Sequence, residues 1–325
     1  MIHSNQILPI ARSLSSKSNR MEAEACEIAR LPEELLSAAL SRTSPRVACR
    51  AAAASPAFRV AADSDAVWAR FLPRDLPPLA DGELLLTPPT RKKDLFLRLS
   101  DHGSPLLLPD KLASMWLDRE TGAKCYMLSA RSLTIIWGDT PQYWTWIPLA
   151  DSSRFSEGAQ LLRVCWLDIS GRIPCKMLSL DTVYAAYLVF KANENSFGLD
   201  YPVQDASVSV GATSSTRMVC LQSNDEEDED GDEDGAVPGH YWPVRPHPPL
   251  RTGRRTRRSV PHADNVGRPQ ERADGWMELE LGEFFNDGGG DDDGEVSFSL
   301  VETNGGRWKS GLVVQGIEIR RKKSG

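Results

Sequence analysis

The feature that most constrains this fold is a series of short apolar runs between residues 124 and 320, because they have the period of strands and no helical pattern separates them. The runs are rich in β-branched and aromatic residues and cover 124–129, 133–137, 161–169, 183–191, 206–211, 217–221, 276–281, 295–301 and 312–320. Strict alternation in 277–281 and 295–301 predicts sheets with one wet face, whereas 183–190 is apolar on both faces and should be central. Together they favour an antiparallel sandwich, jelly-roll-like in form.

An insertion interrupts the strand series at residues 223–273. Residues 225–234 contain nine acids in ten positions, and the arginine run RTGRRTRR follows at 251–258. A segment that repels itself and buries little apolar surface is predicted to be disordered. The basic run fits a nuclear import signal or a phosphate-binding patch, and it equally fits a screen for the acidic run. The later GGGDDDG at 288–294 lacks the spaced ligands of a calcium loop and is expected to be a solvated turn.

The N-terminal part has a different pattern, typical of short helices. Residues 1–25 are expected to be a disordered extension, with Met21 as an alternative start. Between residues 31 and 72, Ser44, Ser55 and Ser64 each precede a good first-turn residue, which predicts three capped helices behind an apolar stripe that begins at Leu31. So short a helical unit buries little surface and should need a partner.

Residues 76–123 are expected to be a helical linker. Its helix should run through RKKDLFLRL with Thr90 as the cap, and the segment should fix the helical unit relative to the strands instead of tethering it loosely. We therefore expect an α+β multidomain protein: a helical domain at 26–75, this linker, and an all-β domain at 124–320.

Composition limits the classes of function. The longest apolar run has eight residues, so no segment is expected to span a membrane. Six cysteines without a CxxC pair indicate free thiols in a reducing compartment. None of the five histidines lies on an expected strand, which argues against Ser-His or Cys-His catalysis and against a metal site in the sandwich. We expect no cofactor and no metal.

One turn concentrates aromatic residues. Residues 130–149 place Trp137, Tyr143, Trp144 and Trp146 around the polar sequence Gly-Asp-Thr-Pro. A sugar ring has an apolar face and an edge of hydroxyls, so a shallow sugar site needs an exposed aromatic plane beside carboxylate or amide acceptors. The alternative is that these rings only fill the core, which is the commonest fate of any single tryptophan.

The helical part resembles a known family. LPEELLSAALSRTSPRVACRAAAASPAFRVAADSDAVWARFLP is similar to the F-box of plant proteins, of the variety fused to a phloem-lectin domain. That resemblance implies docking on a Skp-type adaptor, which joins the F-box to a cullin ubiquitin ligase. The implied docking residues are Leu31, Pro32, Leu35, Leu36, Pro45 and Val47. Without the resemblance, these helices would be a small cap on the next domain.

The β part resembles the phloem protein lectin (Nictaba-like) family. The resemblance rests on KCYMLSARSLTIIWGDTPQYWTWIPL, LLRVCWLDISGRIPCKMLS, TVYAAYLVFK, DGWMELELGEFFN and WKSGLVVQGIEIR. It implies a β-sandwich that binds N-acetylglucosamine-containing glycans in the cytoplasm and nucleus. The implied sugar-binding residues are Trp137, Trp144, Glu295 and Glu302. Strict alternation, however, puts Glu295 and Glu302 on opposite faces of one strand, so a bulge or an early strand end would be needed to bring them together.

These expectations combine into a non-catalytic substrate receptor of a ubiquitin ligase, which binds a glycoprotein through its sandwich. The rival from another class is a glycosidase with Glu295 and Glu302 as its acid and nucleophile. Two further alternatives are a nucleocytoplasmic lectin without a ligase role and an RNA-binding phloem protein acting through RTGRRTRR, although nucleic acid is the less expected partner.

Overall fold

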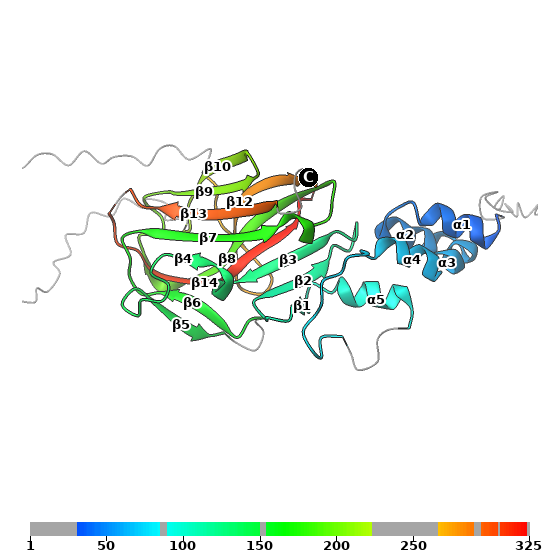
Figure 1. Ribbon diagram of the computed structural model, residues 1–325, viewed down its shortest axis with the longest axis horizontal. Coiled ribbons are helices and arrows are strands. Elements are labelled where there is room, and N and C mark those ends of the chain that lie inside the picture. Colours follow the sequence, from blue (N-terminus) through cyan, green and yellow to red (C-terminus); the bar gives the residue numbers. More distant parts are fainter. Residues whose placement is uncertain are drawn as a thin grey trace, which may run out of the picture.

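The computed structural model describes residues 31–84, 90–149, 154–222, 266–288, 294–304 and 306–323. Expectations about the N-terminal extension, the start codon, the insertion up to residue 265 and the centre of GGGDDDG lie outside these residues. Figure 1 shows a helical unit at one end of the molecule and two stacked sheets at the other. Within the described residues, no helix combines the length and the apolar character needed to cross a membrane.

Four short helices and one helix of the linker form the helical unit. They are α1 (Glu33–Leu40), α2 (Pro45–Ala54), α3 (Pro56–Ala62), α4 (Asp65–Phe71) and α5 (Lys92–Leu99). The hydroxyls of Ser44, Ser55 and Ser64 accept hydrogen bonds from the first-turn amides of α2, α3 and α4, which confirms the three predicted caps. Thr90 does not cap α5; the carboxylate of Asp65 instead accepts from the amide of Lys92 at 2.8 Å.

One tryptophan organises the core of this unit. The indole of Trp68 is buried and donates to the carbonyl of Ala62 at 2.6 Å. The ring of Phe71 lies 5.6 Å from it, and the ring of Phe96, on α5, lies 5.2 Å away. The linker helix therefore supplies part of the core of the helical unit.

Two antiparallel sheets form the rest of the molecule. The nine-stranded sheet has the order β1 (Leu106–Leu107), β2 (Ala113–Leu117), β3 (Lys124–Ser129), β14 (Ser310–Arg321), β8 (Thr182–Phe197), β12 (Met277–Asn286) and β11 (Gln270–Glu271), and β6 (Glu157–Leu161) joins β14 to β5 (Trp144–Pro148). The five-stranded sheet has the order β10 (Thr213–Val219), β9 (Gln204–Val210), β13 (Glu295–Glu302), β7 (Leu167–Pro174) and β4 (Thr134–Ile135). One-turn 3-10 helices follow β3 at Ala130–Ser132 and β7 at Cys175–Met177.

The apolar faces of the two sheets pack on each other. The rings of Phe284 on β12 and Phe298 on β13 lie 6.0 Å apart and link the sheets directly. Leu188 and Ile317 of the larger sheet and Leu300 of the smaller one belong to the same buried cluster. The expected sandwich is confirmed, and β8 is a central strand that pairs with β14 on one side and β12 on the other.

Several boundaries differ from those expected from the sequence. Strands β1 and β2 lie within the segment expected to be a helical linker, so the sheet begins before residue 124; β2 is only five residues long but is buried on both faces. Residues 266–273, expected to belong to the disordered insertion, contribute β11 and a bridge to β10. The run 133–137 yields only the two-residue β4, because Trp137 turns the chain with φ +56°.

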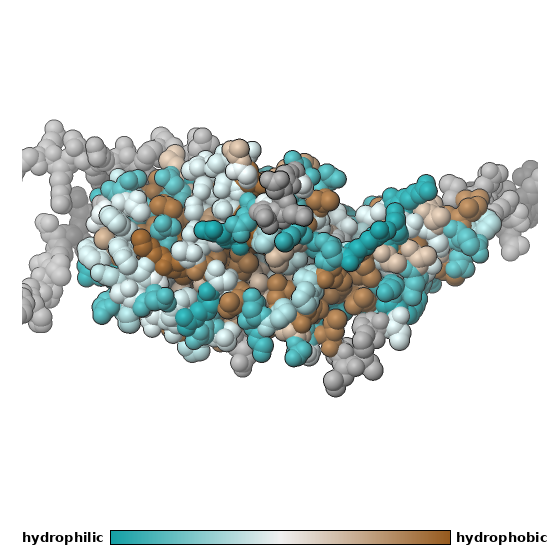
Figure 2. All heavy atoms as spheres, in the orientation of Figure 1, coloured by the Kyte–Doolittle hydropathy of each residue, from teal (hydrophilic) through white to brown (hydrophobic). Residues whose placement is uncertain are grey.

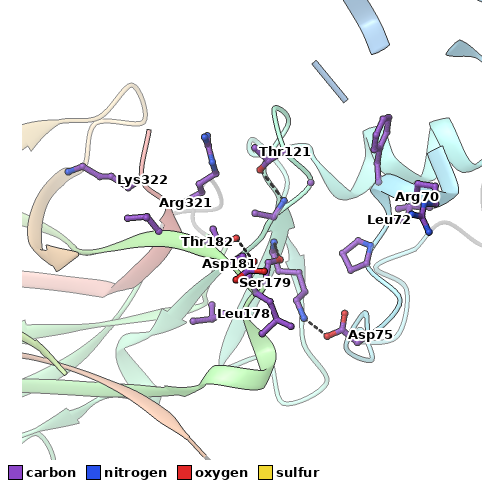
Figure 3. Close-up of a pocket in the computed structure, with 17 residues that line it drawn as sticks. Arg70, Leu72, Asp75, Thr121, Leu178, Ser179, Asp181, Thr182, Arg321 and Lys322 are labelled. Carbon is purple, nitrogen blue, oxygen red and sulfur yellow. Dashed lines mark hydrogen bonds and ion pairs between the residues drawn. The ribbon is translucent and has the colours of Figure 1, made fainter. Parts of the chain in front are cut away.

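The turn between β2 and β3 holds the helical unit against the sandwich. Arg46 of α2 pairs with Glu120 at 2.8 Å, and the buried ammonium of Lys124 reaches Asp75, just after α4, at 2.6 Å. A Cβ at Gly122 (φ +81°) would lie 2.7 Å from the carbonyl of Phe71, so only glycine permits this approach. Asp75, labelled in Figure 3, and Lys124 both line a cavity of about 800 Å³ between the two parts. On the face seen in Figure 2, hydrophobic residues gather at this junction.

Candidate functional site

The end of the sandwich farthest from the helices carries the aromatic turn. In Figure 1, β13 runs away from the helical unit, and the chain returns from that end along β14. The turn after β4 is closed by hydrogen bonds from the Gly138 amide to the Ile135 carbonyl (2.9 Å) and from the Thr140 amide to the Trp137 carbonyl (2.8 Å). Trp137 has the left-handed backbone conformation, which costs a bulky residue on the order of 1 kcal/mol and persists only where its surroundings require it.

Three aromatic rings meet at this turn. The indole of Trp166, from the segment just before β7, stacks on Trp137 with 5.9 Å between ring centroids and an interplanar angle of 13°. The ring of Tyr143 lies 5.1 Å from Trp137. Trp137 and Tyr143 are half-buried, whereas Trp166 is 46% exposed. This arrangement offers an exposed aromatic plane with a rigid backing, which is the surface that the apolar face of a sugar needs.

Trp144 does not contribute to that plane. It begins β5, pairs with Leu161 and is only 1% exposed, so its ring belongs to the core. Its neighbour Trp146 is half-buried, with the guanidinium of Arg131 3.7 Å from the ring centre. Of the two tryptophans expected from the sequence, the structure leaves Trp137 next to an accessible ring face and encloses Trp144.

Glu295 and Glu302 lie at opposite ends and on opposite faces of β13. Glu302 is buried at the aromatic end and forms an ion pair with the fully buried Lys309, while its other oxygen accepts from the Asn304 amide at 3.0 Å. Glu295 is exposed toward the helical end, 3.8 Å from Arg172. No bulge interrupts the pairing of β13 with β7, so the two carboxylates are not brought together.

That separation removes the glycosidase pair. Seven residues of strand span roughly 23 Å, against the roughly 5 to 10 Å between carboxyl groups that glycoside hydrolysis requires.

Burial raises the pKa of the Cys125 thiol to about 12, so this cysteine stays protonated at neutral pH. Among the described residues, no cluster of three or more His, Cys, Asp or Glu side chains is arranged to hold a metal ion.

Polar acceptors lie close in sequence to the exposed plane. Asp168 is two residues after Trp166 on the outward face of β7, and desolvation raises the pKa of its half-buried carboxyl group. Asp139 is exposed in the turn beside Trp137. The outward face of the five-stranded sheet continues with Ser170 and Ser299, and the hydroxyl of Ser299 bonds that of Ser207 at 2.7 Å. Carboxylates and hydroxyls beside an aromatic plane suit the hydroxyl edge of a sugar.

Sequence reasoning did not identify Trp166 as a ring of the aromatic plane, nor Trp308 as a second exposed tryptophan at the same end of the sandwich. Trp308 is 43% exposed, and the guanidinium of Arg163 lies 4.7 Å from its ring centre. Trp166 falls within the run 161–169, which the sequence predicts as one strand, whereas Trp308 stands before the run 312–320 in the segment WKSG. The basic neighbours of Trp308, Arg307 and Lys309, were an available signal for it, but no local pattern distinguished Trp166 from a strand residue.

The helical unit carries the other expected site at the opposite end. Leu31, Leu35 and Val47 are 44%, 55% and 44% exposed, and Pro32 is also exposed. Leu36 and Pro45 are buried, so they support the helices from inside. Exposed aliphatic side chains on a small helical unit are typical of a protein-binding surface.

A buried charge network covers the outer face of the nine-stranded sheet. Glu318 is almost fully buried and pairs with Arg320 at 2.6 Å and Arg272 at 3.0 Å, and both arginines also pair with Glu278. Burial by itself would raise the pKa of Glu318, but the hydrogen bond from His102 and the two guanidinium charges outweigh it and lower that pKa to about 2. The network lines a pocket of about 910 Å³, remote from the aromatic turn.

The described residues thus form an antiparallel sandwich with aromatic rings gathered at one end, joined to a unit of short helices. Residues 123–321 match the family model described as phloem protein 2, and the chain belongs to that family. F-box protein PP2-B10 of Arabidopsis thaliana is 39% identical over 312 residues, which cover 94% of this chain and 98% of the relative. F-box protein PP2-B1 of the same plant is 40% identical over 313 residues, 90% of each chain. The similarity therefore extends beyond the sandwich.

Proposed function

We propose that this chain is a substrate receptor of a Skp-cullin-F-box ubiquitin ligase, with the helical unit bound to the adaptor and the sandwich bound to an N-acetylglucosamine-containing glycan on a target protein. The chain catalyses no reaction in this scheme; holding a target near the ligase raises the local concentration of its lysines. We further propose that it acts in the cytoplasm and nucleus, where the ligase and the target would meet.

The placement of two unlike exposed surfaces at opposite ends of the chain carries this proposal. Aliphatic side chains around Leu35 lie at the helical end, and the Trp137–Trp166 plane lies at the far end of β13. A receptor must bind both partners at once, and two surfaces at opposite ends do not compete for space. The names of the relatives, F-box protein PP2-B10 and F-box protein PP2-B1, support the assignment of the helical end to the adaptor.

The two interactions should differ in strength. Adaptor docking needs an interface of roughly 1,200 to 2,000 Å² to be stable. The glycan rests on an exposed plane beside a few acceptors, so little area is buried and each sugar binds weakly. Repeated sugars on one target would compensate through avidity.

The glycan half is tested by isothermal titration of the full chain with chitotriose, a trimer of N-acetylglucosamine. Trp166→Ala should weaken binding at least tenfold, because it removes the exposed ring, and Trp137→Ala should do the same by removing its backing. Trp276→Phe is the matched control, since Trp276 is buried on another face. No binding of chitotriose or of any N-glycan core by the wild-type chain would refute this half.

The adaptor half is tested by co-purification with a Skp-type adaptor. Leu35→Asp should abolish the complex, because a charge would be desolvated in the interface. Leu97→Asp is the matched control, since Leu97 has a similar exposure on α5, outside the expected docking residues. Equal loss in both variants would contradict the assignment of the docking face.

A further inference from the structure

The buried pair at the aromatic end points to a role for Glu302 and Lys309 that differs from sugar contact. The side chain of Lys309 is fully buried, and a lysine is buried at such a cost only when its charge is paired and its donors are satisfied. Its ammonium has three protons and three acceptors: the Glu302 carboxylate, the Cys165 carbonyl at 3.2 Å and the Arg307 carbonyl at 3.0 Å. No donor is left over for a ligand.

Both carbonyls belong to residues that come directly before an exposed tryptophan. Cys165 precedes Trp166, and Arg307 precedes Trp308. The lysine ammonium thus joins three segments: the end of β13, the stretch before β7 and the stretch before β14. The direction of each indole depends on the backbone that these contacts hold.

We infer that Lys309, charge-balanced by Glu302, is a positioning residue that fixes Trp166, on the proposed glycan surface, and Trp308, a second exposed tryptophan at the same end of the sandwich. The sugar-binding aspect of this inference rests on the proposed function; the orientation of the indoles does not. Glu302 then acts through Lys309 and does not touch the glycan, in contrast to the role that family resemblance implies for it.

Backbone hydrogen bonds connect the same segments as the lysine ammonium. The contribution of the Lys309 side chain can therefore be tested separately from that of the backbone. The backbone amide and carbonyl of Lys309 bond the carbonyl and amide of Val164 at 2.7 and 3.0 Å. These bonds involve only backbone atoms, so replacing the side chain with Met should free the carbonyls of Cys165 and Arg307 without removing the bridge between the segments.

The deciding variant is the double substitution Glu302→Met with Lys309→Met in the full chain, because it removes both charges and leaves neither unpaired. Three quantities are measured: the melting temperature, the indole N–H resonances of Trp166 and Trp308 assigned with Trp→Phe variants, and the affinity for chitotriose. We expect a folded protein in which both indole resonances shift and the affinity falls at least tenfold. Glu318→Gln disrupts another buried ion pair, remote from the aromatic end. It should leave the indole resonances and the chitotriose affinity unchanged.

A second variant keeps the inference testable if the double substitution does not fold. Glu302→Gln preserves the shape of the side chain and the carbonyl contacts of Lys309 but leaves the buried ammonium without its counter-charge, so the melting temperature should fall. In the protein that remains folded, the indole resonances should stay and the affinity should change less than threefold. A large loss of affinity with unmoved indole resonances would identify Glu302 as a direct sugar contact and overturn the inference. Unmoved resonances in the double variant would overturn it as well. If the wild-type chain binds no chitotriose, the proposed function fails, and the indole resonances still decide the positioning role.

Discussion

The helical unit buries its core around one tryptophan, whereas the sandwich spreads its core over two sheets. Trp68 contacts Phe71 and Phe96, and few other large side chains are buried in the helices. In the sandwich, buried residues from both sheets form a larger cluster, which continues into the core of the helices. The larger core can therefore accommodate costly features such as the left-handed Trp137 and the buried Lys309, while the smaller unit depends on each of its contacts.

The largest expected effect is a loss of stability in the helical unit that leaves the sandwich folded. Trp68→Ala should cost roughly 3 to 5 kcal/mol, because it removes a fully buried indole and opens a cavity in the small core. Hydrogen exchange should then show α1–α5 losing protection while β8 and β14 keep theirs. Trp308→Ala is the control, since its exposed ring should contribute little to stability. Loss of protection across both sheets would show that the two regions unfold as one.

A pH titration should act mainly on the sandwich. The pKa of Glu318 falls from its ordinary 4.5 to about 2 on folding, which corresponds to about 3 kcal/mol of stability. Because the folded pKa is the lower one, this contribution is complete above pH 4.5 and is lost as the pH falls toward 2. Urea unfolding of wild type and Glu318→Gln should show a stability difference that shrinks across this range, and a constant difference would contradict the assignment.

Among the described residues of the helical unit, no buried carboxyl group has a pKa lowered as far as that of Glu318. A hydrogen bond from Lys93 lowers the pKa of Asp63, but this carboxylate is partly exposed and solvent screens its charge. Protection of the helices against hydrogen exchange should therefore depend less on pH than protection of β14.

A smaller effect is expected where the two regions meet. Asp75→Asn removes the charge that balances the buried ammonium of Lys124 and should cost about 1 to 3 kcal/mol. Amide exchange of residues 118–124 should speed up, because this turn holds the helical unit. Asp110→Asn, on an exposed turn, is the control. Unchanged exchange in 118–124 would mean that Gly122 and Arg46 hold the junction without the ion pair.

The smallest effect concerns Trp144. Its buried indole N–H has no hydrogen-bond partner among the residues that the structure describes, so Trp144→Phe removes an unsatisfied donor while it opens a modest cavity. The two changes oppose each other, and the net loss should stay below about 1.5 kcal/mol. Chitotriose affinity should stay within threefold of wild type, in contrast to Trp166→Ala; a tenfold loss would return Trp144 to the binding surface.

Local features were predictable from the sequence, and features set by distant partners were not. The caps at Ser44 and Ser55 depend on a hydroxyl and an amide three residues away, so the local sequence determines them. Alternation in 295–301 correctly indicated opposite faces for Glu295 and Glu302. Whether an indole is buried depends on pairing elsewhere: Trp144 is enclosed because β5 pairs with β6, and Trp137 remains half-buried because it turns out of β4.

The binding surface shows the same limit. Trp166 lies in a run that looked like one strand from 161 to 169, but the chain leaves β6 at Leu161 and enters β7 only at Leu167. The gap holds Trp166 at the surface, where it meets Trp137. The pairing of Glu302 with Lys309 was equally unpredictable from the sequence, because the two residues meet only after the chain reverses direction between β13 and β14.

The contacts between the helices and the β2–β3 turn would fix the distance between the two binding surfaces of the proposed receptor. With Gly122 packed on the Phe71 carbonyl and Lys124 bound to Asp75, the spacing between adaptor and captured sugar would be set by the length of the β-sandwich and not by a loose tether. Only lysines at a matching reach from the glycan would then accept ubiquitin, so the position of the glycan on a target would decide which lysines are modified.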